Sequence, residues 1–190
     1  FEERNVGAFD VDHSAPEFAI HQRLNLGPKI SQNMGGGPTY ASPPGYVHTS
    51  YALVDKDQFF ETHNEWFWPR DDKTVYGQLC WTNTSLVEYV ISQVKTMLRN
   101  QPNATVISVS QNDNGNYCND TNEWAVIQEE GSPSGPLLRA VNRVAEAIQE
   151  EFPHVRTHNP FVIISQHTHT HTHRTQVAVD TLAYQYTRKP

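Results

Sequence analysis

"ATVISVSQNDNGN", residues Ala104 to Asn116, joins a short apolar run directly to a polar, turn-rich stretch. The first part, Ala104 to Ser110, is rich in β-branched residues, which favour a buried strand. The second part combines Asn, Asp and Gly, which are typical of turns and loops. In parallel α/β folds, ligands meet the loops that follow the C-terminal ends of strands. The stretch therefore predicts a buried strand that delivers Gln111, Asn112 and Asp113 to a binding face.

Helical patterns lie on both sides of this strand. Ser85 to Asn100 has apolar residues every three or four positions, and Ser85 with Glu88 matches the S-x-x-E capping box. A second stripe of the same period runs from Leu137 to Phe152. Shorter helices are expected at Ser14 to Leu24 and Asp55 to His63, and further strands at Gly45 to Val54 and Val177 to Thr187. Helices that alternate with strands predict an α/β fold with a parallel sheet.

The composition argues against two classes of partner. The chain has 190 residues and a net charge of -7, and its 14 basic residues form no cluster, so nucleic acid is not an expected partner. No apolar run approaches the roughly 20 residues of a membrane span. Three N-glycosylation sequons, at Asn83, Asn103 and Asn119, favour a secreted or extracellular protein. A bridge between the two cysteines, Cys80 and Cys118, is possible.

The stretch "HTHTHTHR" begins at His167 and is the most unusual part of the chain. Histidine-rich tracts bind metals, and this tract offers His167, His169, His171 and His173. In a strand, alternation places neighbouring histidines about 7 Å apart, too far to share one ion. A CA dinucleotide repeat also encodes alternating Thr and His. Two interpretations follow, a metal-binding tract or the translation of a retained intron that covers Val155 to Gln176.

Several strings in the chain resemble an uncharacterised family of carbohydrate-active proteins. They are "GAFD" (7–10), "RLN" (23–25), "YVHTSY" (46–51), "QLCWTN" (78–83), "ATVISVSQNDNGNYC" (104–118), "EEGSPSGPLLRAVNRVAEAIQEEFP" (129–153) and "DTLAYQYTRKP" (180–190). That family carries a domain of unknown function related to the barrels of alpha-glucuronidases and hexosaminidases. Removing Val155 to Gln176 gives "FPHVAVDTLAYQYT", which resembles the family pattern without a gap.

The resemblance implies a fold and a function. The expected fold is a partial (β/α) TIM-type barrel like those of glycoside hydrolases, truncated at both ends. A complete barrel needs about 250 residues, so several units are expected to be missing. Residues 1–190 form one incomplete domain, interrupted at 155–176 by the intron or by a low-complexity insertion, and 155–176 should be irregular. The expected function is that of a glycoside hydrolase-like protein acting on glycans. A noncatalytic glycan-binding protein is the alternative.

The chain departs from the family after "NYC". Family members commonly continue with C-x-C-x-x-C, a cluster able to hold a metal or a redox pair, whereas here "NDTNEW" follows Cys118. A single sulfur cannot replace that cluster. Cys118 is therefore expected to be a buried or loop thiol, and no cofactor is expected.

Glycoside hydrolysis usually needs two carboxyl groups, so acidic residues near strand ends are the candidates. Asp113 is the first, since it follows the buried strand; the alternative is an Asx turn, because N-D-N-G is turn chemistry by itself. Glu130 and Asp180 are further candidates. Glu130, with Glu129, could instead favour a helix start, and Asp180 could make a structural pair.

Other polar and aromatic residues are candidates for sugar binding. The residues expected to contact substrate are Arg23, Asn25, His48, Asn112 and Tyr184. Arg23 can hold a carboxylate with a bidentate fork, and structural hydrogen bonds are the alternative role. Aromatic faces pack on sugar rings, and Trp66, Trp68, Trp81, Trp124, Tyr184 and Tyr186 provide such faces. Within "EWFWPR" (65–70) a core role is favoured.

Overall fold

The computed structural model describes His21 and residues 39–158. Several predictions concern residues outside this part. They are the helix at Ser14–Leu24, the strand at Val177–Thr187, the histidine tract, and the candidates Arg23, Asn25, Asp180 and Tyr184. The structure does not describe these residues, so the predictions about them remain predictions.

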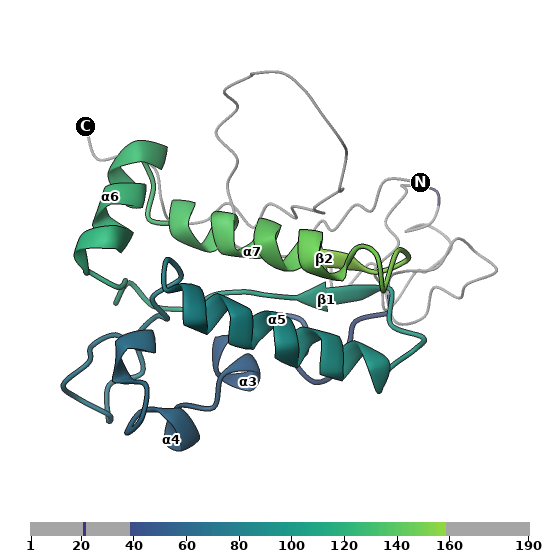
Figure 1. Ribbon diagram of the computed structural model, residues 1–190, viewed down its shortest axis with the longest axis horizontal. Helices are drawn as coiled ribbons and strands as arrows, with labels where there is room; N and C mark the ends of the chain where they lie inside the picture. The colour runs from purple at the N-terminus through teal and green to yellow at the C-terminus, as the bar shows by residue number, and fades with distance from the viewer. Residues whose placement is uncertain (1–20, 22–38, 159–190) are drawn as a thin grey trace.

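The described part is a mixed structure in which two long helices pack over a small parallel sheet (Figure 1). The helices are α3 (Ser50–Leu53), α4 (Lys56–Phe59), the 3-10 helix η2 (Asn64–Trp66), α5 (Thr84–Arg99), α6 (Thr121–Glu130) and α7 (Gly135–Ile148). The strands are β1 (Val106–Ser108) and β2 (Arg156–His158).

The sheet is parallel on both sides of β1. β2 pairs with β1 in the register Val106 to Arg156 and Ser108 to His158. On the opposite edge, Tyr40 forms a parallel bridge with Val106, and the Ala41 amide donates to the Val106 carbonyl at 2.8 Å. The chain from β1 through α6 and α7 to β2 is therefore a β-α-β crossover. The described residues thus contain two short parallel strands joined by helices, and the α/β class and the closure of the sheet into a barrel stay predictions.

The apolar stripes of α5 and α7 form the core with β1. Helix α5 buries Leu86, Val87, Val90, Val94 and Leu98, and α7 buries Leu137, Ala140, Val141, Val144, Ala145 and Ile148. Ile107 and Val109 belong to the same cluster. The spacing therefore predicts the two main helices correctly, and near the end of α5 Leu98 is fully buried while Met97 is partly buried.

The start of α5 differs from the predicted capping box. Asn83 is the N-cap residue, and its side-chain oxygen accepts a hydrogen bond from the Leu86 amide at 3.2 Å. Ser85 instead donates to the Asn83 oxygen at 2.8 Å and accepts from Trp66 Nε1 at 2.9 Å. Asparagine and serine cap helices about equally well. With Asn83 as the cap, the Ser85 hydroxyl can accept the hydrogen bond from Trp66.

The strand predicted at Gly45–Val54 is wrong. His48 has a left-handed φ of 55°, and the helix α3 begins two residues later. The hydroxyl of Thr49 donates to the Ser108 carbonyl at 3.1 Å, and that of Ser50 to the Ser110 carbonyl at 2.8 Å. Side-chain hydroxyl groups, and not a ladder of backbone hydrogen bonds, therefore attach Thr49 and Ser50 to β1. Because this attachment does not require an extended backbone, the segment can be helical.

Helix α6 and strand β2 were not expected at their positions. Asp120 caps α6 by accepting from the Glu123 amide at 2.8 Å, and Gly131 ends the helix with a φ of 66°. Glu129 and Glu130 therefore lie at the end of a helix, not at the start of one. The prediction that 155–176 is irregular is wrong for Arg156–His158, because the exposed edge of β1 pairs with this segment.

Candidate functional site

The chain after β1 is fixed by buried hydroxyl groups. The Ser110 amide donates to Thr49 Oγ1 at 2.8 Å, and the Thr49 amide donates to Ser110 Oγ at 3.1 Å. Both residues are fully buried, so these bonds are shielded from water. The segment that carries His48 is thereby held against the C-terminal end of β1. The structure brings together two regions that the sequence had placed near a binding face.

A buried amide, Gln78, shapes the loop that follows. Its Oε1 accepts from the Asn112 amide at 3.0 Å, while its Nε2 donates to the carbonyls of Asn112 at 2.7 Å and Asn114 at 2.8 Å. The backbone amide of Gln78 also donates to the Asn116 carbonyl at 2.9 Å. One side chain thus satisfies three backbone groups of the loop. No periodic pattern marks Gln78 for this role, since it lies in an irregular segment.

Asn112 lies at this end of β1 but is committed to the structure. Its Nδ2 donates to the Gly77 carbonyl at 2.7 Å, and the same carbonyl accepts from the Tyr51 hydroxyl at 2.9 Å. Burial raises the pKa of Tyr51 to about 12, and neighbouring Tyr76 adds to the increase. A Cβ atom at position 77 would lie 2.1 Å from the Trp68 carbonyl oxygen, so only glycine fits there.

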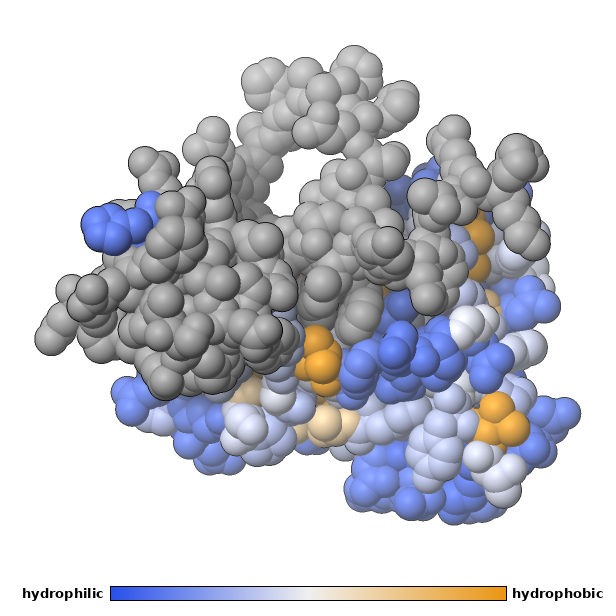
Figure 2. Space-filling model, turned by 180° about the vertical axis from the view of Figure 1, so that it is seen from behind, coloured by the Kyte–Doolittle hydropathy of each residue, from blue (hydrophilic) through white to orange (hydrophobic). Residues whose placement is uncertain are grey.

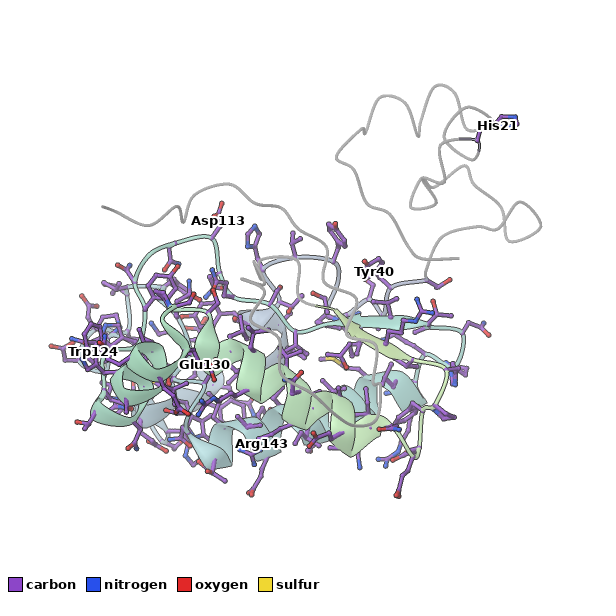
Figure 3. All side chains as sticks on the ribbon, turned by 90° about the horizontal axis from the view of Figure 1, so that it is seen from above. His21, Tyr40, Asp113, Trp124, Glu130 and Arg143 are labelled. Atoms are coloured by element: carbon purple, nitrogen blue, oxygen red, sulfur yellow. A yellow bond between two sulfur atoms is a disulfide. The ribbon has the colours of Figure 1, made fainter. Side chains whose placement is uncertain are left out.

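Asp113 is exposed at the outer edge of the loop, and Figure 3 shows its side chain directed away from the rest of the molecule. Within residues 39–158, no hydrogen bond holds its carboxylate. The Asx turn predicted as its alternative role belongs to Asn114, whose Oδ1 accepts from the Asn116 amide at 3.0 Å. Asp113 is therefore available to a ligand.

An exposed aromatic ring lies next to this loop. Tyr76 is 53% exposed, its carbonyl accepts from Asn114 Nδ2 at 3.0 Å, and its ring meets Tyr51 edge-on at 5.3 Å between centroids. The buried ammonium of Lys56 lies 5.0 Å from the Tyr76 ring centroid, and burial lowers the pKa of Lys56. Tyr76 was absent from the predicted aromatic residues, although a tyrosine in the polar string "DDKTVYGQ" was a usable signal.

We call the group formed by His48, Tyr76 and residues 111–116 the β1 rim. It combines a carboxylate, amides, an imidazole and one flat aromatic face at the C-terminal end of a buried parallel strand. This combination suits a polar ligand with apolar patches, such as a sugar ring. His48 is exposed within this group and lies directly before the buried Thr49.

Glu130 is not part of the β1 rim. Its Oε1 pairs with Arg139 at 2.5 Å, and Glu129 pairs with the same guanidinium at 2.9 Å. Figure 3 shows Glu130 on the helical side of the molecule, well separated from Asp113. The structure therefore gives Glu130 a surface ion pair and does not bring it to Asp113.

The two cysteines form a disulfide, Cys80–Cys118, so the expected thiol at Cys118 is wrong. The sequence alone could not decide between a thiol and a disulfide. The bridge requires the two Cα atoms, which are 38 positions apart in the chain, to approach to 5.2 Å, and this depends on the tertiary fold. Asp120 lies near both sulfurs, but the bridge leaves no thiolate to bind a metal. Asp120 instead pairs with Arg70 at 2.5 Å.

A small cavity of about 10 Å³ lies beside this disulfide, lined by Gln78, Trp81, Gln111, Tyr117 and Glu123 among others. It has room for about one water molecule and not for a sugar ring. Glu123 is buried, and its carboxylate accepts from the Trp81 amide at 3.2 Å and from the Thr82 amide at 2.9 Å. Burial raises the pKa of Glu123. Sequence reasoning missed this carboxylate, which holds α6 to the turn before α5.

The predicted aromatic faces divide between core and surface. Trp66 and Trp81 are 3% and 5% exposed, which confirms the core role for Trp66. Trp124 is 54% exposed on α6 and lies apart from Asp113 in Figure 3. Within residues 39–158, none of the helices has the length and apolarity required to cross a membrane.

Comparison with known proteins gives a family without an assigned function. The family model described as Domain of unknown function (DUF4838) matches residues 1–159. No curated protein and no solved structure matches the chain. The match covers β1, the β1 rim and both long helices, and it ends shortly after β2. The chain belongs to the DUF4838 family.

Proposed function

We propose that this chain is part of a glycoside hydrolase-like protein that acts on glycans, and that the β1 rim contacts the sugar. The observation that supports this most is that one hydrogen-bonded group of loops carries both an exposed carboxylate, Asp113, and an exposed ring, Tyr76. Carboxylates accept hydrogen bonds from sugar hydroxyls, and aromatic faces pack on the C–H faces of the ring. The resemblance to relatives of alpha-glucuronidases and hexosaminidases belongs to the same proposal.

The described surface favours a polar ligand over an apolar partner. On the face shown in Figure 2, hydrophilic residues dominate the coloured surface, and the strongly hydrophobic residues are isolated. Among the described residues, the exposed large hydrophobic side chains are Tyr76 and Trp124. A protein-docking surface usually has a contiguous apolar centre, whereas sugar sites use single aromatic platforms.

Catalysis needs a second carboxylate near Asp113, because both hydrolytic mechanisms use a pair. Glu130 is held elsewhere by Arg139. Asp180, which is outside the described residues, remains the candidate for the second group. A noncatalytic glycan-binding protein is the alternative, and it needs only the β1 rim.

The test is Asp113→Asn in the full-length protein made from spliced message. If Asp113 is a catalytic group, we expect turnover to fall by orders of magnitude while affinity for oligosaccharides of N-acetylglucosamine stays nearly intact. If Asp113 only binds, affinity should fall about tenfold, because a charge-assisted hydrogen bond becomes a neutral one. Calorimetry measures the affinity, and release of a chromogenic glycoside measures turnover. A loss of turnover by orders of magnitude with affinity intact supports a catalytic role for Asp113 and the hydrolase assignment.

A charge-matched control is Glu146→Gln. Glu146 is exposed on α7, one turn after Arg143, which lies on the opposite side of the molecule from Asp113 in Figure 3. Glu146→Gln removes one negative charge, as Asp113→Asn does, but leaves the β1 rim unchanged. Affinity and turnover should therefore equal those of the natural protein. If Asp113→Asn leaves both quantities at the control value in a folded protein, the proposal is wrong.

A further inference from the structure

We propose that Asn103 carries an N-linked glycan in the native protein, and that the sequons at Asn83 and Asn119 stay unmodified. The proposal is independent of the carbohydrate-binding function. It rests on the local structure at the three asparagines and on the disulfide.

Asn103 is presented by a tight exposed turn. The Ala104 amide donates to the Gln101 carbonyl at 3.0 Å, which places Asn103 at the third position of the turn between α5 and β1. Asn103 is exposed, and none of the described residues makes a hydrogen bond to its side chain. A large polar substituent on its amide nitrogen therefore projects into water and displaces no internal contact.

The position is also separate from the candidate site. Asn103 precedes β1, whereas Asp113 follows it, so the two residues lie at opposite ends of the strand. The hydroxyl-bearing residue of the sequon, Thr105, is at the start of the strand, where its Oγ1 accepts from the Thr39 amide at 2.9 Å. A glycan at Asn103 thus leaves the β1 rim open.

Asn83 has a structural role that a glycan would disturb. Its Oδ1 is the acceptor for the Leu86 amide at 3.2 Å and for the Ser85 hydroxyl at 2.8 Å. Ser85 also accepts from the buried Trp66 indole. The Asn83 side chain is therefore half-buried and already bonded at the start of α5, whereas that of Asn103 is exposed and unbonded among the described residues.

Asn119 is exposed but is a poor acceptor for a different reason. The middle residue of its sequon is Asp120, a carboxylate, and the residue before it is the bridged Cys118. The glycan donor is a lipid-linked oligosaccharide diphosphate, and the negative charge of Asp120 opposes its approach. The middle residue of the Asn103 sequon is the neutral Ala104.

The disulfide supplies the second, independent observation. Bridges such as Cys80–Cys118 form in oxidising compartments, which in eukaryotic cells include the compartment where glycans are transferred. In that reaction the Asn103 amide nitrogen bonds to the anomeric carbon of the donor sugar. The bond from this carbon to the diphosphate oxygen breaks, the lipid diphosphate leaves, and the amide loses one proton.

The experiment is expression of the full-length protein in secreting eukaryotic cells, followed by peptide mapping. Deglycosylation with an amidase in heavy-oxygen water marks each modified asparagine as a labelled aspartate. We expect the label at Asn103, and loss of the glycan from the intact mass in Asn103→Gln but not in Asn83→Gln or Asn119→Gln.

Thr105→Ser and Thr105→Val separate the modification from folding. Serine keeps the sequon and should retain the glycan, whereas valine keeps the shape of the side chain and should lose it. An unmodified Asn103 in the secreted protein would overturn the proposal. So would a label at Asn83 or Asn119, or a protein found only in the cytosol with reduced cysteines.

Discussion

Replacement of Cys80 and Cys118 by alanine should lower the free energy of unfolding by about 4 kcal/mol. The bridge closes a loop between residues 38 positions apart, and the chain-entropy relation gives this value for a loop of that length. The loop contains α5, β1 and residues 111–116 of the β1 rim. Denaturant titration of the full-length protein, followed by circular dichroism, measures the difference.

Reduction provides the control for this variant. A thiol reductant should lower the stability of the natural protein by a similar amount and leave the double alanine variant unchanged. Equal stability of the variant and the oxidised natural protein would contradict the role assigned to the bridge. The same result would also remove the support that the disulfide gives to an oxidising compartment.

Deletion of Val155–Gln176 should stabilise the protein by about 2 kcal/mol, because it removes a buried hydroxyl without a partner. Thr157 is 3% exposed on β2, and its Oγ1 has no hydrogen-bond partner within the described part of the chain. Deletion joins His154 to Val177, so that Val179 takes the place of Thr157 along the chain. Valine has nearly the shape of threonine and no polar group to satisfy.

The point variant Thr157→Val isolates this effect without changing the length of the chain. We expect it to supply most of the gain in the free energy of unfolding. The matched control is Thr96→Val on α5, where the hydroxyl donates to the Ser92 carbonyl at 2.9 Å on an exposed face. The control should be neutral or slightly destabilising. If Thr157→Val behaves like the control, β2 does not need an apolar residue at this position.

The long elements were predictable because their burial repeats along the chain. The stripe of Leu86, Val90 and Val94 fixes which face of α5 is buried, and the β-branched run at 104–110 contains β1. Helix α6 escaped prediction because it buries only Glu123 and Ile127, so its apolar pattern is weak. Its N-cap Asp120 and C-cap Gly131 were the remaining signals.

The candidate site was only partly predictable, for a different physical reason. Position after a buried strand sufficed to place Asp113 and Asn112 at its C-terminal end. The partners that shape the loop, Gln78 and Gly77, come from a segment more than thirty residues earlier, as the 34-residue separation of Gln78 from Asn112 shows. Contacts over such distances depend on the tertiary fold and leave no local pattern.

Hydrogen exchange of the spliced, full-length protein can show whether glycans bind at the β1 rim. Oligosaccharides of N-acetylglucosamine serve as the neutral probe and a glucuronic acid-bearing oligosaccharide as the acidic one. If glycans bind there, we expect slower exchange at 76–78 and 111–116 with at least one probe, and no change at the Asn103 turn. Protection confined to other parts of the protein, or binding by neither probe, would contradict it.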